Sequence, residues 1–290
     1  MKNPSAALDT SLLPQYVMSA AFMERFLIAA HINGAPIERS SNTEIVKVVD
    51  ASELEVDLLK YFTENKESFR DEFTAELEDK LSEGAFKLFC EVLVEEWFDG
   101  MSKRKNGRSR RLKRSIYDYL LTLNNSETQF VQTEDLPVDI EPLIDAEDIA
   151  AILTVNDQMI YRHIEAWKQS HPNSDSISDS DVFLRRGLAI NGELDTSEPY
   201  REMDFINSYS IAFSAPEKFS QIGKKTPVLV NGEITLFASR VLFFSPFIPG
   251  MDANQLEFGI IPSVMPLPIH YQGSHGGILE YILDPAPFHR

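Results

Sequence analysis

One polar run, from His171 to Ser180, divides the chain into two parts with different sequence patterns, and this division limits the folds open to it. Before the run, apolar residues recur with helical spacing. After it, short β-prone segments alternate with turn signals. The run itself is rich in Pro, Asn, Asp and Ser, which favour turns. Helices followed by strands predict an α+β fold rather than an alternating, doubly wound sheet.

The first part of the chain predicts several helices. An apolar residue recurs at every fourth position from Phe69 to Leu81, which places one apolar stripe along a helix. Ser52 and Glu55 have the spacing of a capping box, in which both side chains bind amides of the first helical turn. Further helices are expected over Phe86–Trp97, Ile116–Leu123, Glu141–Leu153 and Asp157–Gln169, with a loop over Asn124–Val138.

The second part predicts a β-rich domain, because its short apolar runs are rich in β-branched and aromatic residues. The expected strands are Val182–Leu184, Ser208–Phe213, Pro227–Val230, Ile234–Phe237, Val241–Phe244, Phe258–Ile261 and Ile278–Ile282. Asn231 and Gly232, between two of these runs, are typical of a hairpin turn because both tolerate positive φ. Gly273–Gly277 predicts a further turn.

The composition is that of a globular protein without covalent cross-links. The chain has 290 residues, of which 43% are hydrophobic, enough for one large core or two small ones. Cys90 is the only cysteine, so a disulfide framework within the chain is excluded. The most apolar early stretch, Tyr16–Ile32, contains Glu24 and Arg25 and is short for a membrane span. We therefore expect a cytoplasmic protein that does not enter a membrane.

The charge of the chain is unevenly distributed. The net charge is −18, yet residues 103–114 hold eight of the 27 basic residues and no acidic one. The remainder, with 19 basic and 45 acidic residues, carries −26. Such a basic tract on an acidic body indicates either a segment that binds a partner or an internal counter-charge that docks on the protein's own acidic surface. The sequence favours neither over the other.

Three short motifs follow one another within the β-rich part: an Arg-Gly, a Ser-x-Ser and a Gln-x-Glu. They are Arg186–Gly187, Ser208–Ser210 and Gln255–Glu257. Arg-Gly occurs once in the chain. Ser-x-Ser and Glu-x-Glu also occur in the linker and in the expected helices, where the strand context is absent. Each motif alone is common, and their order and context carry the signal.

Together the motifs resemble those of the arginine–serine–glutamate class of mono-ADP-ribosyltransferases, which includes clostridial Rho-modifying exoenzymes, phage-encoded transferases and pierisin-like toxins. The resemblance covers about residues 180–270, with Tyr209 where the family often has Thr. It implies an α+β protein in which residues 181–290 form a catalytic core of two packed, mostly antiparallel sheets. Residues 1–125 would be a helical module containing the basic tract, and residues 126–180 would be helical segments and a linker.

The resemblance also implies that the chain cleaves NAD as a substrate. Glu257 would stabilise the positive charge that develops on the ribose when the bond to nicotinamide breaks. The guanidinium of Arg186 would bind the pyrophosphate through paired donors. Arg185 would point to the opposite face of the strand, because side chains alternate along a strand. The implied catalytic residues are Arg186, Ser208, Gln255 and Glu257.

The remaining NAD contacts implied by the resemblance come from the first two motifs and the segment after them. Gly187 would leave its backbone open to the nicotinamide amide. Ser208 would hold Glu257 and the ribose in register, with Ser210 as a further cofactor-binding residue. Phe219 would stack on the nicotinamide ring. Taken singly, an arginine at the end of a strand is more often a surface ion-pair partner, and Ser208 is more often a turn or ladder residue. Glu257 could be a charge on an edge strand that discourages sheet pairing. Phe219 is as often a core residue as a ligand contact.

Gln255 bears on the acceptor of the ADP-ribose. A glutamine cannot act as a base, but its side chain can donate to and accept from an amide or a nucleobase edge. In the family, Gln-x-Glu accompanies asparagine acceptors and also guanine in nucleic acid. The basic tract would suit a phosphate backbone, with Lys103, Arg104, Arg110 and Arg111 as candidate contacts. A protein acceptor and a nucleic-acid acceptor remain equally open, and arginine comes third.

Two alternatives compete with the transferase hypothesis. The chain could be a non-enzymatic interaction protein whose basic tract binds RNA or an acidic partner, or a degenerate transferase that binds NAD without transfer. A transferase of this kind would suit a bacterial or phage toxin or a defence effector, restrained by an inhibitory partner or antitoxin. The six histidines lack metal-ligand spacing, so we expect no metal.

Overall fold

The computed structural model describes residues 51–97, 107–123, 139–170, 182–202, 204–212, 214–264 and 267–283, and three short strands before them. These strands, β1 (Leu8–Asp9), β2 (Ile37–Glu38) and β3 (Ile45–Val46), form a small sheet of their own. The loop expected over Asn124–Val138 and the polar run from His171 to Ser180 lie outside the described residues, as do Lys103 and Arg104.

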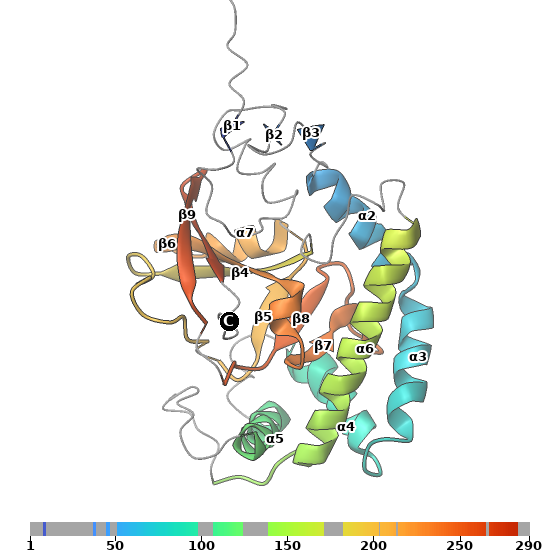
Figure 1. Cartoon of the computed structure of the whole chain (residues 1–290). Coiled ribbons are helices and arrows are strands. Elements are labelled where there is room, and N and C mark those ends of the chain that lie inside the picture. The colour runs from blue at the N-terminus through green and yellow to red at the C-terminus, as the bar shows by residue number, and fades with distance from the viewer. Residues whose placement is uncertain are drawn as a thin grey trace, which may run out of the picture.

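Helices occupy the first half of the described chain. They are α2 (Ala51–Glu64), α3 (Lys66–Glu78), α4 (Ala85–Val92), the π-helical turn η2 (Leu93–Trp97), α5 (Arg108–Thr122) and α6 (Ala146–Ser170). Helices α2, α3 and α6 lie along the right of Figure 1, and α5 lies below the sheet. Helix α6 contacts both α3 and α5. No described helix is long and apolar enough to cross a membrane.

The apolar stripe predicted from Phe69 onward forms the buried face of α3. Phe69, Phe73 and Leu77 are buried there, while Leu81 lies beyond the end of the helix. The capping box predicted at Ser52 is wrong. Helix α2 already begins at Ala51, and a capping residue must stand just outside the first turn with a non-helical backbone.

The two helices expected around residues 141–169 are one continuous helix, α6. Thr154 and Asn156 lie between the two expected helices, and their side-chain donors bond within the helix and to the sheet. Thr154 Oγ1 donates to the carbonyl of Ala150 at 2.8 Å. Asn156 Nδ2 donates to the carbonyls of Ile152 and Leu242, at 3.0 and 2.9 Å. Asn156 therefore ties α6 to the sheet as well as to its own helix.

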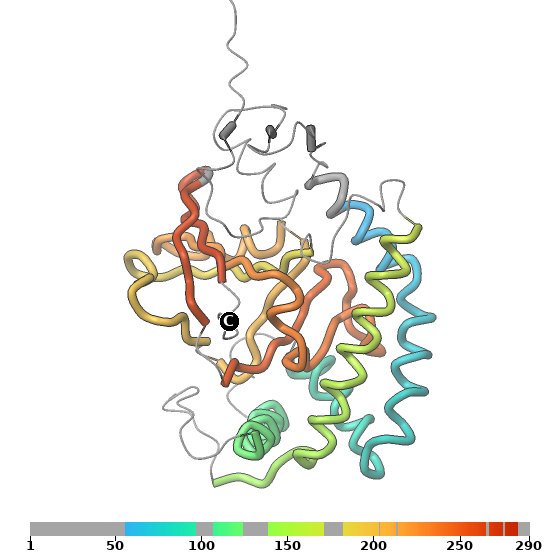
Figure 2. Tube along the Cα trace, in the orientation of Figure 1, coloured from blue at the N-terminus to red at the C-terminus, as the bar shows by residue number. Residues whose placement is uncertain are grey.

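The second half of the chain forms a seven-stranded sheet, which confirms the α+β fold (Figure 1). Figure 2 shows the path of the chain in the same orientation. In the order in which they pair, the strands are β7 (Val241–Phe244), β8 (Glu257–Ile260), β5 (Asn207–Ser210), β4 (Phe183–Ile190), β6 (Thr226–Glu233), β10 (Ile278–Leu283) and β9 (Ile269–His275). All neighbouring pairs in this sheet are antiparallel except β6 and β10. Strands β4 and β5 meet at one register position, Arg185 opposite Ser210.

Two local predictions in this half are wrong. Ile234–Phe237 forms the 3-10 helix η5 rather than a strand. Asn231 and Gly232 lie inside β6, paired with β4, rather than in a hairpin turn. The turn predicted over Gly273–Gly277 is confirmed at Gly276 and Gly277, between β9 and β10, where both glycines have positive φ. A two-residue turn needs that backbone, which glycine adopts without a steric cost.

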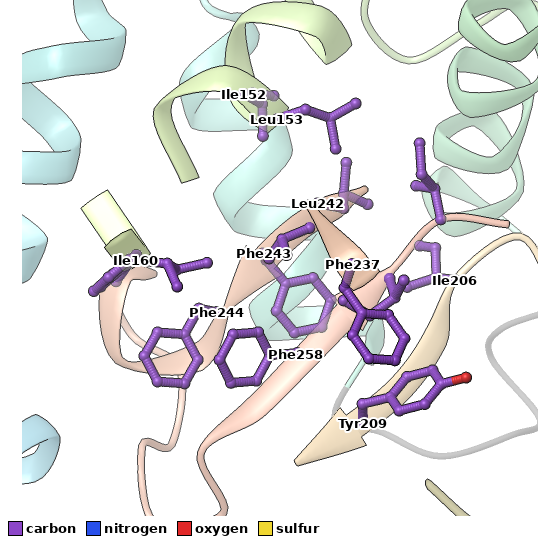
Figure 3. Packing of buried hydrophobic residues seen from close by; sticks show 14 of the residues in the cluster. Ile152, Leu153, Ile160, Ile206, Tyr209, Phe237, Leu242, Phe243, Phe244 and Phe258 are labelled. Atoms are coloured by element: carbon purple, nitrogen blue, oxygen red, sulfur yellow. The ribbon is translucent and has the colours of Figure 1, made fainter. Parts of the chain in front are cut away.

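The apolar core is shared between the helices and the sheet. One cluster of buried residues extends from Leu58 in α2 to Leu283 in β10, across the domain boundary expected near residue 180. Figure 3 shows where the two parts meet, with Ile152 and Leu153 of α6 facing Leu242 and its neighbours on β7. The helices of the first half therefore pack on the sheet, with α6 against β7.

Helix α7 (Ser214–Ser220) packs against β4 and β6. Gly187 of β4 makes this close approach possible. A Cβ added at Gly187 would lie 1.8 Å from the carbonyl oxygen of Pro216 and 2.9 Å from the nitrogen of Ser220, both in α7. The structure thus gives Gly187 a packing role between strand and helix.

Candidate functional site

The serine and glutamate predicted from the second and third motifs lie together on neighbouring strands. Ser208 of β5 and Glu257 of β8 are 49 residues apart in the sequence, and Ser208 Oγ donates a hydrogen bond of 2.6 Å to Glu257 Oε1. Both side chains are half-buried. A carboxylate held by a hydroxyl at the surface of a sheet can keep its charge and its direction while it faces a ligand.

The second serine of the motif holds the backbone next to Glu257. Ser210 is buried and lies opposite Glu257 in the β5–β8 pairing. Its Oγ donates to the carbonyl oxygen of Gln255 at 2.5 Å and accepts from the amide of Ala212 at 2.9 Å. The two serines therefore do different things: Ser208 contacts the carboxylate and Ser210 fixes the chain that carries it.

Between Gln255 and Glu257 the backbone takes an unusual conformation. Leu256 has φ of 43°, in the left-handed region that branched side chains rarely adopt. The amide of Glu257, on the other side of this residue, donates to Ser245 Oγ at 3.0 Å. Strained residues of this kind persist where the surroundings hold them, and they cluster at functional sites. Gln255 is exposed beside this bend.

Sequence reasoning missed Ser245. It follows the apolar strand β7 and precedes Pro246, a pattern typical of a turn and of nothing more specific. Only the pairing of β7 with β8 brings it to Glu257.

Strand pairing also decides which arginine shares a face with this pair. Residues directly opposite each other in an antiparallel sheet point to the same face. Arg185 is opposite Ser210, and Ser210 is opposite Glu257, so these three share one face with Ser208. Arg186 points to the other face, because side chains alternate along a strand. The structure thus brings Ser208, Ser210 and Glu257 together but does not bring Arg186 to them.

On its own face, Arg186 lies within a polar group. Its guanidinium donates to Asn207 Oδ1 and pairs with Asp204 at 3.0 Å, and it lies 5.8 Å from the centre of the Tyr209 ring. The side chain is 12% exposed. Burial works against its charge, but nearby phenol and carboxylate oxygens outweigh this effect and raise the pKa of Arg186 above its ordinary value. A phosphate would have to replace Asp204 or Asn207 to reach it.

Arg185 is more deeply buried, with 3% of its surface exposed. Its Nη1 donates to the carbonyl oxygens of Phe183 and Ile211, at 3.1 and 2.9 Å. The second of these bonds crosses from β4 to the chain that leaves β5. Arg185 therefore joins the two strands at the single position where they pair.

Phe219, the predicted partner of the nicotinamide ring, lies on α7 and is 51% exposed. This helix covers the face of β4 that carries Arg185 and Gly187, because Gly187 contacts Pro216 and Ser220. Phe219 is thus on the helix that covers the Glu257 face of β4, and its ring is open to solvent.

The described part of the basic tract is largely engaged within the chain. Arg108 binds three glutamates, Glu91, Glu95 and Glu96. Arg111 donates to the carbonyls of Glu141 and Pro142, at 3.3 and 2.9 Å, and Arg114 pairs with Asp118 at 2.9 Å. Arg108 and Arg114 therefore act as internal counter-charges, while Arg111 is held by backbone carbonyls. Arg110 is exposed.

Among the described residues, no group of three or more His, Cys, Asp or Glu side chains is placed to hold a metal ion. Cys90 is half-buried, and burial together with Glu91 raises the pKa of its thiol to about 12. This thiol is therefore protonated at neutral pH and a poor nucleophile.

Comparison with known proteins assigns the chain to no family. No family model, no curated protein and no solved structure matches the chain. The functional argument therefore rests on the residues and their geometry.

Proposed function

We propose that the chain is a mono-ADP-ribosyltransferase that uses NAD. The observation that carries the proposal is the hydrogen bond between Ser208 and Glu257, 2.6 Å long and formed between adjacent strands beside the strained Leu256. The Ser-x-Ser and Gln-x-Glu motifs suggested this pair from the sequence, and nothing in the local sequence requires residues 49 positions apart to meet.

In the proposed reaction, the bond between nicotinamide and the ribose C1′ breaks and its electron pair leaves with nicotinamide, which becomes neutral. A nucleophile of the acceptor bonds to C1′ and loses a proton to water. The products are ADP-ribosyl acceptor, nicotinamide and H⁺. Glu257 stabilises the charge that develops on the ribose, and Ser208 keeps the carboxylate aimed at it. A prealigned charge needs no reorganisation as the bond breaks.

The sheet supports the finer assignment of a transferase-like core. Its two halves, β7-β8-β5 and β4-β6-β10-β9, join only where Arg185 faces Ser210. We propose that these halves correspond to the two packed sheets of the family. The proposed site lies next to this junction, because Ser208 and Glu257 belong to the two strands nearest to it on one side.

Two arginines are candidates to bind the pyrophosphate of NAD, and an experiment decides between them. Arg186 is the residue matched by the motif, and it must exchange Asp204 for a phosphate. Arg185 shares the face of Glu257, and it must open its bonds to two backbone carbonyls. Replacing each by Ala and measuring the Kd for NAD separates them. The contact exists in the ground state, so the residue that binds phosphate raises the Kd as well as lowering the rate.

The acceptor is proposed to be a protein side-chain amide or a nucleobase, because Gln255 is exposed beside Glu257 and offers both a donor and an acceptor. Gln255→Glu should reduce transfer to the natural acceptor while it spares hydrolysis of NAD to ADP-ribose. Equal loss of both reactions would remove Gln255 from acceptor recognition.

The test of the activity is incubation of the protein with NAD labelled in the adenylate part and a cell lysate. Released nicotinamide and label in macromolecules are both measured. We expect both signals with the wild type and neither above background with Glu257→Gln. Glu198→Gln, at an exposed glutamate outside the site, is the matched control and should behave as the wild type. Full activity of a folded Glu257→Gln protein would refute the site.

Treatment of the labelled lysate with protease and with nucleases assigns the acceptor class. If the acceptor is nucleic acid, Arg110→Gln should weaken its binding and reduce the slope of log affinity against log salt by about one unit per lost phosphate contact. Arg108→Gln is the control at a residue held by glutamates, and it should leave the slope unchanged. A slope that Arg110→Gln leaves unchanged indicates a protein acceptor. Label that protease removes and nucleases do not remove indicates the same.

A further inference from the structure

We propose that Ser245 is a positioning residue that holds the Glu257 carboxylate at Ser208 by fixing the backbone bend at Leu256. The catalytic consequence rests on the proposed function, whereas the positioning itself does not. Ser245 lies outside all three motifs and begins the short 3-10 helix η6 (Ser245–Phe247).

The bend at Leu256 is held on both sides by buried hydroxyls. On one side, Ser210 Oγ donates to the carbonyl of Gln255 at 2.5 Å. On the other, Ser245 Oγ accepts from the amide of Glu257 at 3.0 Å. Leu256 itself donates its amide to the carbonyl of Ala253 at 3.1 Å. A positive φ at a branched residue is unfavourable, and these three bonds stabilise it.

The burial of these groups makes the bend depend on the Ser245 hydroxyl. Ser245 is fully buried, at 0% exposure, and so is Leu256. An amide without a partner in such surroundings is costly, so the loss of the Ser245 hydroxyl favours any backbone change that returns the Glu257 amide to another acceptor.

Such a backbone change would affect the reaction by altering the direction of the Glu257 side chain. In a regular strand Gln255 and Glu257 would point to the same face, and the bend at Leu256 alters this relation. A relaxed Leu256 therefore turns Glu257 relative to Ser208 and to Gln255. Ser245 touches neither substrate nor carboxylate in this proposal and acts only through the backbone.

The test compares Ser245→Ala with Ser115→Ala in the full chain. Ser115, on α5, is the matched control: it is also fully buried, and its Oγ accepts from the amides of Leu143 and Ile144 at 3.0 Å, outside the sheet. Both substitutions remove a buried hydroxyl that accepts from backbone amides. A purely structural role of Ser245 therefore predicts the same behaviour for both variants.

For NAD cleavage we expect Ser245→Ala to lower kcat by about ten- to a hundredfold with an unchanged KM for NAD, because the misplaced carboxylate acts mainly in the transition state. Ser115→Ala should stay within about twofold of the wild type. In a double-mutant cycle, Ser208→Ala should cost much less in the Ser245→Ala background than in the wild type. Additive effects, or equal kcat losses in the Ser245 and Ser115 variants, would overturn the proposal.

A second measurement is independent of activity. Hydrogen exchange of the Glu257 amide, followed by NMR, should accelerate about tenfold or more in Ser245→Ala and stay unchanged in Ser115→Ala. Unchanged exchange at Glu257 overturns the positioning role even if the wild type cleaves NAD. Accelerated exchange in a protein whose wild type cleaves no NAD supports the positioning and refutes the proposed function.

Discussion

Two ion pairs, one between helices and one in the sheet region, hold their charges in different surroundings. Between the helices, Arg162 of α6, 49% exposed, contacts Glu72 and Glu76 of α3 near the surface. In the sheet region, the corresponding pair is buried. The side chain of Glu202, 1% exposed, accepts from Arg240, from the Tyr209 hydroxyl and from the amide of Ser263.

This difference separates contacts that assemble the fold from contacts that hold a site. Surface ion pairs gain little, because water screens them and their long side chains lose freedom. Buried carboxylates are costly unless every partner is in place, so they persist only where the surrounding structure aligns them. Glu257 stands between these cases, since its carboxylate is half-buried and aligned by Ser208. The following predictions test this division, from the largest expected effect to the smallest.

The strongest contrast is between two glutamates that each accept from a serine residue. Glu96 accepts from the amides of Arg108 and Ser109 at the start of α5, while Glu257 accepts from the Ser208 hydroxyl. Glu257→Gln should lower the proposed NAD turnover by about a thousandfold or more with little change in Tm. Glu96→Gln should lower the free energy of unfolding by about 1 kcal/mol, as for a lost helix cap, with unchanged turnover.

Enzyme assays and thermal unfolding on both variants check this contrast. If Glu257→Gln unfolds the protein, or if Glu96→Gln abolishes turnover, the division between site and scaffold fails.

The next contrast is between two arginine–glutamate pairs. Arg240→Met leaves Glu202 buried without its ion pair and should cost about 3–5 kcal/mol of unfolding free energy. Arg162→Met should cost about 0–1 kcal/mol, because its pair is exposed. Denaturant unfolding measures both values. Equal costs would show that burial does not distinguish the two regions.

The pH dependence of stability offers a smaller effect at the contact between α6 and the turn that precedes β7. Burial raises the pKa of Asp157 to about 6, against hydrogen bonds from Ser239 that lower it. The native state therefore holds a proton that the unfolded state releases, and this stabilisation is lost as pH rises from about 4 to 6. Asp157→Asn should raise the unfolding free energy at pH 7.5, by about 3 kcal/mol at most, and by nothing near pH 4. Asp71→Asn, on the exposed side of α3, controls for the lost charge.

His163, also on α6, should give the opposite pH dependence of stability. Burial, together with Arg162, lowers its pKa to about 4. Below about pH 6.5 the unfolded state takes up a proton that the native state refuses, so stability is lost as pH falls towards 4. His163→Gln should remove this loss, by about 1–2 kcal/mol at pH 4.5, and leave stability at pH 7.5 nearly unchanged. Urea midpoints at both pH values check it, and a gain at pH 7.5 alone would contradict the assignment.

Much of the outline was predictable from the sequence, because it depends on local periodicity. The apolar spacing from Phe69 predicted the buried face of α3, and the later β-prone runs predicted most strands of the sheet. The wrong predictions arose where a local signal was overridden by the tertiary structure. Asn231 and Gly232 carry a turn signal that pairing on both sides of β6 overrides, and Thr154 and Asn156 are polar residues that α6 accommodates.

For the candidate site, the sequence by itself determined the chemical groups: a serine motif, a Gln-x-Glu and two adjacent arginines. It also limited where they could lie, because each motif adjoins a β-prone run. The tertiary structure decided which groups meet. The register of β5 on β8 places Ser208 at Glu257, and the register of β4 on β5 puts Arg185, not Arg186, on that face. Ser245 enters only through the pairing of β7 with β8. A shift of one residue in any of these pairings would turn each side chain to the opposite face, and no local pattern in the sequence encodes that choice.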